Sequence, residues 1–127
     1  MTIGEAINLT DDMRPNQIGR AMKIRFLSDL DTLVYNEVMQ KYEPDANTPE
    51  TFAGYDADAA NVNDTELLVK SPHAMLYVWW LMMQIDQINV ELDKYENSAA
   101  LYNAEWKAYN RAYIREHRSP MPAHMCY

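Results

Sequence analysis

Hydrophobic residues recur at helical spacing along most of the chain. A short stretch at residues 2–9 begins with Thr2 and Glu5 at the spacing of a capping box, in which each side chain binds the backbone N–H of the other. A longer face follows in residues 16–42, where apolar side chains repeat at steps of three, four and five residues: Ile18, Met22, Phe26, Leu30, Leu33 and Val38. We therefore predict a short first helix and a long second one.

The second half of the chain carries the longest periodic pattern. Ser71 and Pro72 are a favourable N-cap and first helical residue. Apolar and aromatic residues then follow at helical spacing: Tyr77, Leu81, Ile85, Ile88, Leu92, Tyr95, Tyr102, Trp106, Tyr109 and Tyr113. A single helix of this extent would be about 70 Å long. We therefore predict two helices, residues 72–96 and 98–118, with a break at Asn97-Ser98, and a continuous rod is the alternative.

Between these helical regions, residues 43–66 have a different character. They contain seven acidic residues and no basic one, together with two prolines and a glycine, which predicts a long acidic loop. The segment Leu67-Leu68-Val69 that follows is apolar and rich in strand formers. It can run extended against the helices or pair with the edge of another chain. Together, residues 43–70 are expected to form one extended loop.

These elements predict an all-α fold, a small helical bundle in which residues 1–127 form a single domain and residues 119–127 a flexible tail. Composition agrees, because three glycines and nine methionines suit helices packed through flexible side chains better than a glycine-rich sheet. The single cysteine, Cys126, excludes an internal disulfide and indicates a reducing compartment. No apolar run is long enough to cross a bilayer, so we expect no membrane partner.

Charge is both unbalanced and segregated along the sequence. The net charge of -8 argues against a protein that coats nucleic acid non-specifically. The acidic loop includes Asp56, Asp58, Asp64 and Glu66. The last predicted helix carries, within an arc of about 80° on the side away from its tyrosines, the residues Lys107, Arg111, Arg115 and Arg118. Such a basic face is ordinarily solvated. It can also meet the acidic loop of another copy in a head-to-tail contact, or touch DNA.

Motifs of catalysis and metal binding are missing from the sequence. The acidic loop does not match an EF-hand, because positions six and twelve counted from Asp56 hold Asn61 and Leu67 in place of glycine and glutamate. That leaves a solvated loop, a surface offered to a partner, or an irregular calcium site. The tail offers one histidine and one cysteine where structural zinc needs four ligands. We predict no enzyme, no cofactor and no metal site, and we expect Asp86 to pair with an arginine of another helix or chain.

Residues 75–83 are apolar on every side of their predicted helix. Opposite the face of Leu81, Ile85 and Ile88 lies a second stripe, formed by Leu76, Trp79, Met83 and Val90. One explanation is a central helix surrounded by the rest of the chain. The other is that the stripe packs on another subunit, since a chain of this size can hardly enclose such a helix completely.

Several strings follow one another in a recognisable order. They are RFLSDLDTLVYNEV in the first long helix, DTELLV leading to Pro72, QID followed by Asn89 and Glu91, and YENS leading to Tyr102-Asn103. Across residues 15–120 this order resembles a family of small helical head-tail connector (adaptor) proteins of tailed bacteriophages. These are packing and turn motifs rather than catalytic ones.

The resemblance implies a structural virion protein that forms a ring, commonly of twelve copies, between the portal and the tail. Its partners would be further copies of itself, the portal protein, and a tail or tail-completion protein. DNA would pass through the channel without specific binding, because an acidic wall repels phosphate. The protein would be made in the bacterial cytoplasm and located in the neck of the virion. A rival of another class is a small soluble helical binding or regulatory module that holds a partner helix on its aromatic stripe.

Overall fold

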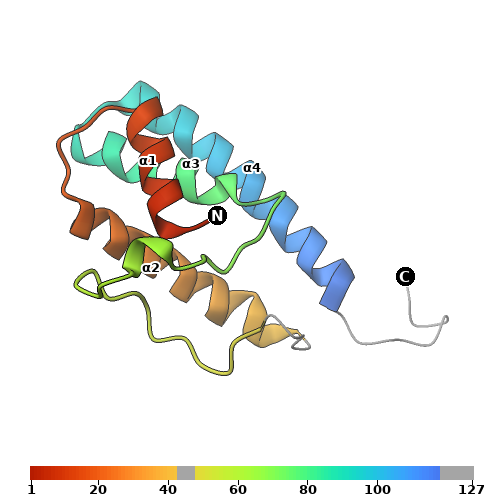
Figure 1. Ribbon diagram of the computed structural model, residues 1–127. Coiled ribbons are helices and arrows are strands. Elements are labelled where there is room, and N and C mark those ends of the chain that lie inside the picture. Colours follow the sequence, from red (N-terminus) through yellow and green to blue (C-terminus); the bar gives the residue numbers. More distant parts are fainter. Residues whose placement is uncertain (43–47, 118–127) are drawn as a thin grey trace.

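The computed structural model describes residues 1–42 and 48–117, and the predicted all-α class is confirmed (Figure 1). The described ranges contain four α-helices and two short 3₁₀ helices. In chain order these are α1 (Ile3–Met13), α2 (Arg20–Glu37), η1 (Met39–Lys41), η2 (Val62–Asp64), α3 (Met75–Ile88) and α4 (Leu92–His117). The predicted tail at residues 119–127 lies outside the described residues.

Helix α1 begins as the sequence predicts and runs further. The Thr2 hydroxyl accepts a hydrogen bond from the Glu5 backbone N–H and donates one to the Glu5 carboxylate, both at 3.2 Å. The helix continues to Met13 rather than ending at residue 9, because its buried face extends to Thr10. The Thr10 hydroxyl donates to the Ala6 carbonyl at 2.7 Å, which satisfies this polar group inside the core.

Helix α2 begins at Arg20, later than predicted, because Asn16 holds the preceding residues in a non-helical turn. The Asn16 side chain accepts from the Ile18 N–H at 3.0 Å and donates to the Arg14 carbonyl at 2.9 Å. The buried face of α2 also differs from the predicted one, since Met22 and Leu33 are exposed. The residues that turn inward are Lys23, Ile24, Leu27, Leu30, Asp31, Val34 and Tyr35. Because the charged residues Lys23 and Asp31 lie within this face, the apolar pattern of the sequence did not reveal it.

Helices α3 and α4 form an antiparallel hairpin, and its turn is not where the sequence predicts. The turn is Asn89-Val90-Glu91, while α4 passes without interruption through Asn97-Ser98. The predicted break is therefore wrong. Ser98 does not cap a helix, because its hydroxyl bonds to the buried carboxylate of Asp86 at 2.7 Å and to the Lys94 carbonyl at 3.0 Å. Ser71 and Pro72 likewise precede α3 in a turn, and the helix itself starts at Met75.

Helix α3 lies at the centre of the core. Five of its hydrophobic side chains are completely buried: Leu76, Tyr77, Val78, Leu81 and Ile85. The extended segment at residues 65–69 packs against the helices, where Leu67 and Val69 are also fully buried. It is tied to the start of the chain by bonds from the Ile3 N–H to the Thr65 carbonyl and from the Leu67 N–H to the Met1 carbonyl. Of the two predicted roles for this segment, the described chain shows the first, extension against the helices.

Candidate assembly surfaces

The described part of the basic face of α4 is exposed. Helix α4 has 26 residues, a length of about 39 Å, and its last turns form the end of the molecule furthest from the hairpin turn (Figure 1). Lys107, Arg111 and Arg115 are exposed on it, and none of them forms an ion pair within residues 1–42 and 48–117. Arg118, predicted to join them, lies outside the described residues. The opposite side of the helix is anchored by buried tyrosines.

The acidic loop is fastened to α2 and presents carboxylates to solvent. Asp56, Asp58 and Asp64 are exposed, and no ion pair involves them in the described part of the chain. The Tyr55 N–H donates to the Ser28 hydroxyl at 3.0 Å, which holds the loop on α2. These three carboxylates are therefore carried on an attached loop and remain available to a cation from outside the chain.

Glu66 differs from the other predicted acidic residues because it has local partners. Its carboxylate lies 3.3 Å from the N-terminal amine and 3.7 Å from the Lys70 ammonium. The hydrogen bond and the charge of the N-terminal amine lower the pKa of Glu66. Glu66 is exposed, so this pair is screened by water and salt. We assign Glu66 to the attachment of the first residues of the chain rather than to the free acidic surface.

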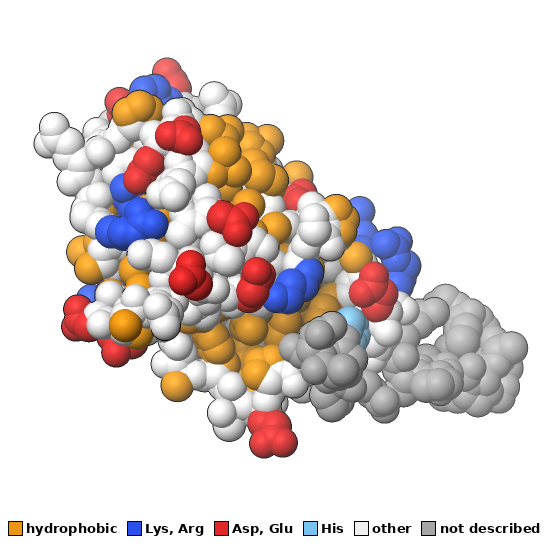
Figure 2. Space-filling model, viewed as in Figure 1, with side chains coloured by type: hydrophobic (Ala, Val, Ile, Leu, Met, Phe, Trp, Pro, Cys, Tyr) orange, Lys and Arg blue, Asp and Glu red, His pale blue; other side chains and the backbone are white. Residues whose placement is uncertain are grey.

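Among residues 1–42 and 48–117, no ion pair joins the basic face to the acidic loop. The acidic loop runs along α2, whereas the basic face lies on the last turns of α4 (Figure 1). On the face drawn in Figure 2, acidic and basic side chains are both spread over the surface, and one group of basic side chains lies at the edge beside the second half of α4. Their described charged residues, Lys107, Arg111 and Arg115 on one side and Asp56, Asp58 and Asp64 on the other, are exposed.

The predicted second stripe of α3 is not a continuous exposed face. Leu76 is fully buried by the chain's own residues, and Trp79 and Met83 are half-buried. The neighbouring Trp80 ring N–H donates to the Phe26 carbonyl at 2.9 Å, which holds that side of α3 on α2. The central-helix explanation thus accounts for most of the apolar run. Only Val90, at 75% exposure, stands out in solvent.

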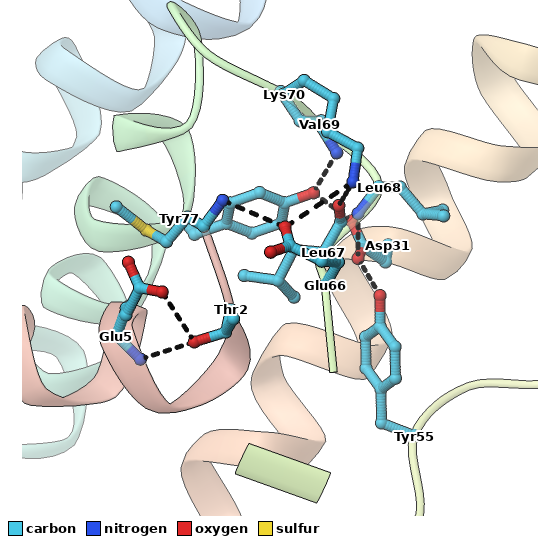
Figure 3. Close-up of polar contacts among 11 residues, drawn as sticks. Thr2, Glu5, Asp31, Tyr55, Glu66, Leu67, Leu68, Val69, Lys70 and Tyr77 are labelled. Atoms are coloured by element: carbon cyan, nitrogen blue, oxygen red, sulfur yellow. Dashed lines mark hydrogen bonds and ion pairs between the residues drawn. The ribbon is translucent and has the colours of Figure 1, made fainter. Parts of the chain in front are cut away.

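A buried carboxylate that sequence reasoning missed joins four parts of the fold (Figure 3). Asp31 on α2 is completely buried. It accepts hydrogen bonds from the Tyr77 hydroxyl at 2.6 Å, from the Leu68 N–H at 3.1 Å and from the Tyr55 hydroxyl. The Tyr77 hydroxyl in turn accepts from the Val69 N–H at 2.6 Å. The signal in the sequence was an aspartate in register with the apolar face of α2.

Burial dominates the electrostatics of this cluster. It raises the pKa of Asp31, and the three donors only partly oppose that effect. Burial, reinforced by the nearby Asp31 carboxylate, also raises the pKa of Tyr77 and of Tyr55. Because Asp31 is completely enclosed, the cluster cannot reach a substrate, and we interpret it as a structural tie between the loop, the extended segment and the helices.

Asp86 pairs with an arginine from a distant part of the sequence, as predicted. Its carboxylate binds the Arg14 guanidinium, which enters from the segment after α1. Asp86 is completely buried and its second oxygen accepts from Ser98. The pair lies beneath the hairpin turn, where the Glu91 N–H donates to the Asp86 carbonyl at 2.9 Å. It is a structural ion pair that fixes the turn against α1.

A pocket of about 210 Å³, the end pocket, lies between the turn before α3 and the last turns of α4. Its apolar wall is formed by Met39, Leu68, Pro72, Tyr109, Ala112 and Tyr113. Lys70, His73, Glu116 and His117 supply polar groups. Within the described ranges, no three histidine, cysteine, aspartate or glutamate side chains come together in a way that could hold a metal ion.

No family model matches the chain, and neither a curated protein nor a solved structure resembles it significantly. Among the helices of the described residues, none combines the length and apolar character needed to cross a bilayer.

Proposed function

We propose that this protein is a structural virion protein, a subunit of a ring between the portal and the tail of a tailed bacteriophage. The ring extends the DNA channel and gives the tail its attachment surface. Its partners are further copies of the chain, the portal protein and a tail or tail-completion protein, and its place is the neck of the virion. The observation that carries the proposal is that the described cations of the basic face and the exposed carboxylates Asp56, Asp58 and Asp64 lie on different elements and form no ion pair in the part of the chain that the structure describes.

Two complementary surfaces on one chain favour a head-to-tail contact. When the basic face of one copy meets the acidic loop of the next, the second copy still offers its own basic face. Such a contact repeats, and it closes into a ring if the rotation between copies permits. Each exposed ion pair contributes only about 0.2–1 kcal/mol. Ion pairs of this strength determine which partner binds and in which register, while apolar contacts supply most of the affinity.

The acidic surplus suits a protein that lines or borders a DNA channel. The net charge is -8, and the described carboxylates of the acidic loop are exposed. A wall of this sign repels the phosphate backbone, so DNA slides past without adhering. The basic face would be occupied by neighbouring subunits and thereby withdrawn from DNA.

Reversing the basic face tests this contact. In the variant Arg111→Glu with Arg115→Glu, assembly on the portal protein is expected to fall at least tenfold, because two attractive pairs become repulsive. Helicity by circular dichroism should be unchanged, since both side chains are exposed. Arg25→Glu is the matched control, because Arg25 is an exposed cation on α2.

A compensating charge reversal in the acidic loop tests whether this loop is the partner of the basic face. Asp56→Lys with Asp58→Lys should restore assembly to the reversed α4 variant if these surfaces meet. Assembly can be measured by negative-stain electron microscopy and sedimentation with purified portal protein. Unchanged assembly of the α4 variant would show that the basic face merely contacts water.

A further inference from the structure

Two hydrogen bonds anchor the acidic loop to α2 at Tyr55. The Tyr55 N–H donates to the Ser28 hydroxyl at 3.0 Å. The Tyr55 side-chain hydroxyl donates to the carboxylate of Asp31, which is completely buried (Figure 3). Ser28 and Asp31 are three residues apart on α2 and therefore lie on the same side of the helix. The backbone and the side chain of Tyr55 are thus both held by one surface of α2.

Gly54 permits the close approach that the Ser28 bond requires. Its φ is 89°, a left-handed conformation that glycine adopts without steric cost. A Cβ atom at this position would lie 2.5 Å from the Ser28 hydroxyl oxygen, which is closer than van der Waals contact. Any larger residue would therefore push the loop off α2 or turn the Ser28 hydroxyl away from the Tyr55 N–H.

Aromatic packing extends the attachment along α2. The Phe52 ring contacts the rings of Tyr35 and Tyr55, with centroid distances of 6.0 and 5.2 Å. The Tyr35 hydroxyl donates to the Glu50 carbonyl at 2.6 Å. The contacting residues of α2 run from Ser28 to Tyr35, about two helical turns. Residues 50–55 are therefore fastened to α2 within the free chain.

The exposed carboxylates of Asp56 and Asp58 follow this attachment directly. The Asp58 N–H donates to the Asp56 carboxylate at 2.9 Å, and the Ala59 N–H donates to the Asp56 carbonyl at 3.2 Å, so one tight turn carries both acids. After the turn, Val62 is 7% exposed and belongs to the core. The two carboxylates thus lie on a short stretch of chain between fixed points at Tyr55 and Val62.

We propose that Gly54 and Tyr55 are positioning residues for the contact between copies, because they hold Asp56 and Asp58 in place before the basic face of a neighbour arrives. The inference rests on the proposed function, and it adds uncharged residues that set the strength of the ionic contact. A loop that becomes ordered only on binding loses affinity to the entropy of ordering. A loop held in advance by α2 avoids this loss, which matters where each ion pair is weak.

The double variant Gly54→Ala with Tyr55→Phe tests the attachment without changing a charge. Alanine places its Cβ against Ser28, and phenylalanine keeps the ring but cannot bond to Asp31. In the isolated chain, the amide hydrogen of residue 55 should exchange with solvent about tenfold faster or more, as measured by NMR. Tyr55→Phe alone should raise that rate about fivefold, the value of one net hydrogen bond, and it serves if the double variant unfolds. Wild-type exchange rates in these variants would overturn the proposal.

Tyr77→Phe is the matched control, because Tyr77 donates to the same carboxylate from α3 rather than from the loop. It loses stability but leaves Tyr55 attached, so exchange at residue 55 should stay within about twofold of the wild type. Assembly on purified portal protein, measured by sedimentation, should weaken about fivefold or more in the double variant and less than about twofold in Tyr77→Phe. Equal weakening by the two would show a general stability effect and overturn the positioning role.

A thermodynamic cycle shows whether the attachment acts through the carboxylates. Asp56→Asn with Asp58→Asn removes both charges and keeps a side-chain oxygen at residue 56 for the turn. In that background, Gly54→Ala with Tyr55→Phe should weaken assembly no further, since the turn then carries no carboxylate to position. The same loss in both backgrounds would overturn the proposal.

The ring and the positioning role fail in different experiments. Normal ring assembly by the Gly54→Ala and Tyr55→Phe double variant would refute the positioning role and leave the ring intact. A wild-type chain that forms no ring on the portal would refute the proposed function and, with it, the positioning of a contact between copies.

Discussion

Asp31→Ala is expected to lower the free energy of unfolding by about 3 kcal/mol. The carboxylate is the shared acceptor for Tyr55, Leu68 and Tyr77, and its removal leaves buried donors without partners at about 1–3 kcal/mol each. Urea denaturation followed by circular dichroism measures the loss. Asp29→Ala is the matched control, because Asp29 lies exposed on the same helix and should change stability by less than about 0.5 kcal/mol. Equal stability of the two variants would refute the structural role of the cluster.

The stability that Asp31 contributes should decline as pH rises. Burial raises its pKa, so the folded state holds this proton more tightly than the unfolded chain does. The contribution is therefore complete below the ordinary pKa of 3.8 and is lost as pH rises through the raised pKa of the folded state. In the Asp31→Asn variant the side chain at this position does not titrate. The stability advantage of the wild type over Asp31→Asn should shrink between acidic and neutral pH, and an advantage that grows with pH would contradict the shift.

Arg14→Met is the second substitution with a large expected effect, a loss of about 3 kcal/mol. It leaves the fully buried Asp86 carboxylate with Ser98 as its remaining side-chain partner. The free energy of unfolding from urea denaturation measures this loss, and Arg25→Met on the exposed surface of α2 is the control.

The double variant Arg14→Met with Asp86→Leu distinguishes a lost ion pair from lost packing. Replacing both charges with apolar groups removes the uncompensated carboxylate, so stability should return to within about 1 kcal/mol of the wild type. A double variant that is less stable than Arg14→Met alone would mean that Asp86 stabilises the fold through partners other than Arg14, such as Ser98.

Local sequence signals predicted the fold class and the first helix because each depends on short-range chemistry. The Thr2 and Glu5 capping pair and the long apolar repeats specify helices without reference to the rest of the chain. The hairpin turn could not be predicted in the same way. Val90 has no turn propensity, and the better N-cap, Ser98, is drawn into α4 by the carboxylate of Asp86, a contact that exists only in the folded chain.

The candidate surfaces also differ in how far short-range sequence signals predict them. Exposure of the described cations of α4 and of the described carboxylates of the acidic loop was expected from the sequence, since charged residues without partners stay in water. The stripe on α3 was harder to judge, because burial of Leu76 depends on how α1, α2 and the extended segment close around it. Asp31 was overlooked because a charged residue within an apolar face gives no sign of which hydroxyls it will meet.

The most direct test of the account is the stoichiometry of the wild-type chain with purified portal protein, determined by native mass spectrometry. The ring proposal predicts a complex in which a closed set of copies, commonly twelve, binds one portal assembly. A chain that leaves the portal unaltered at every mixing ratio would contradict it.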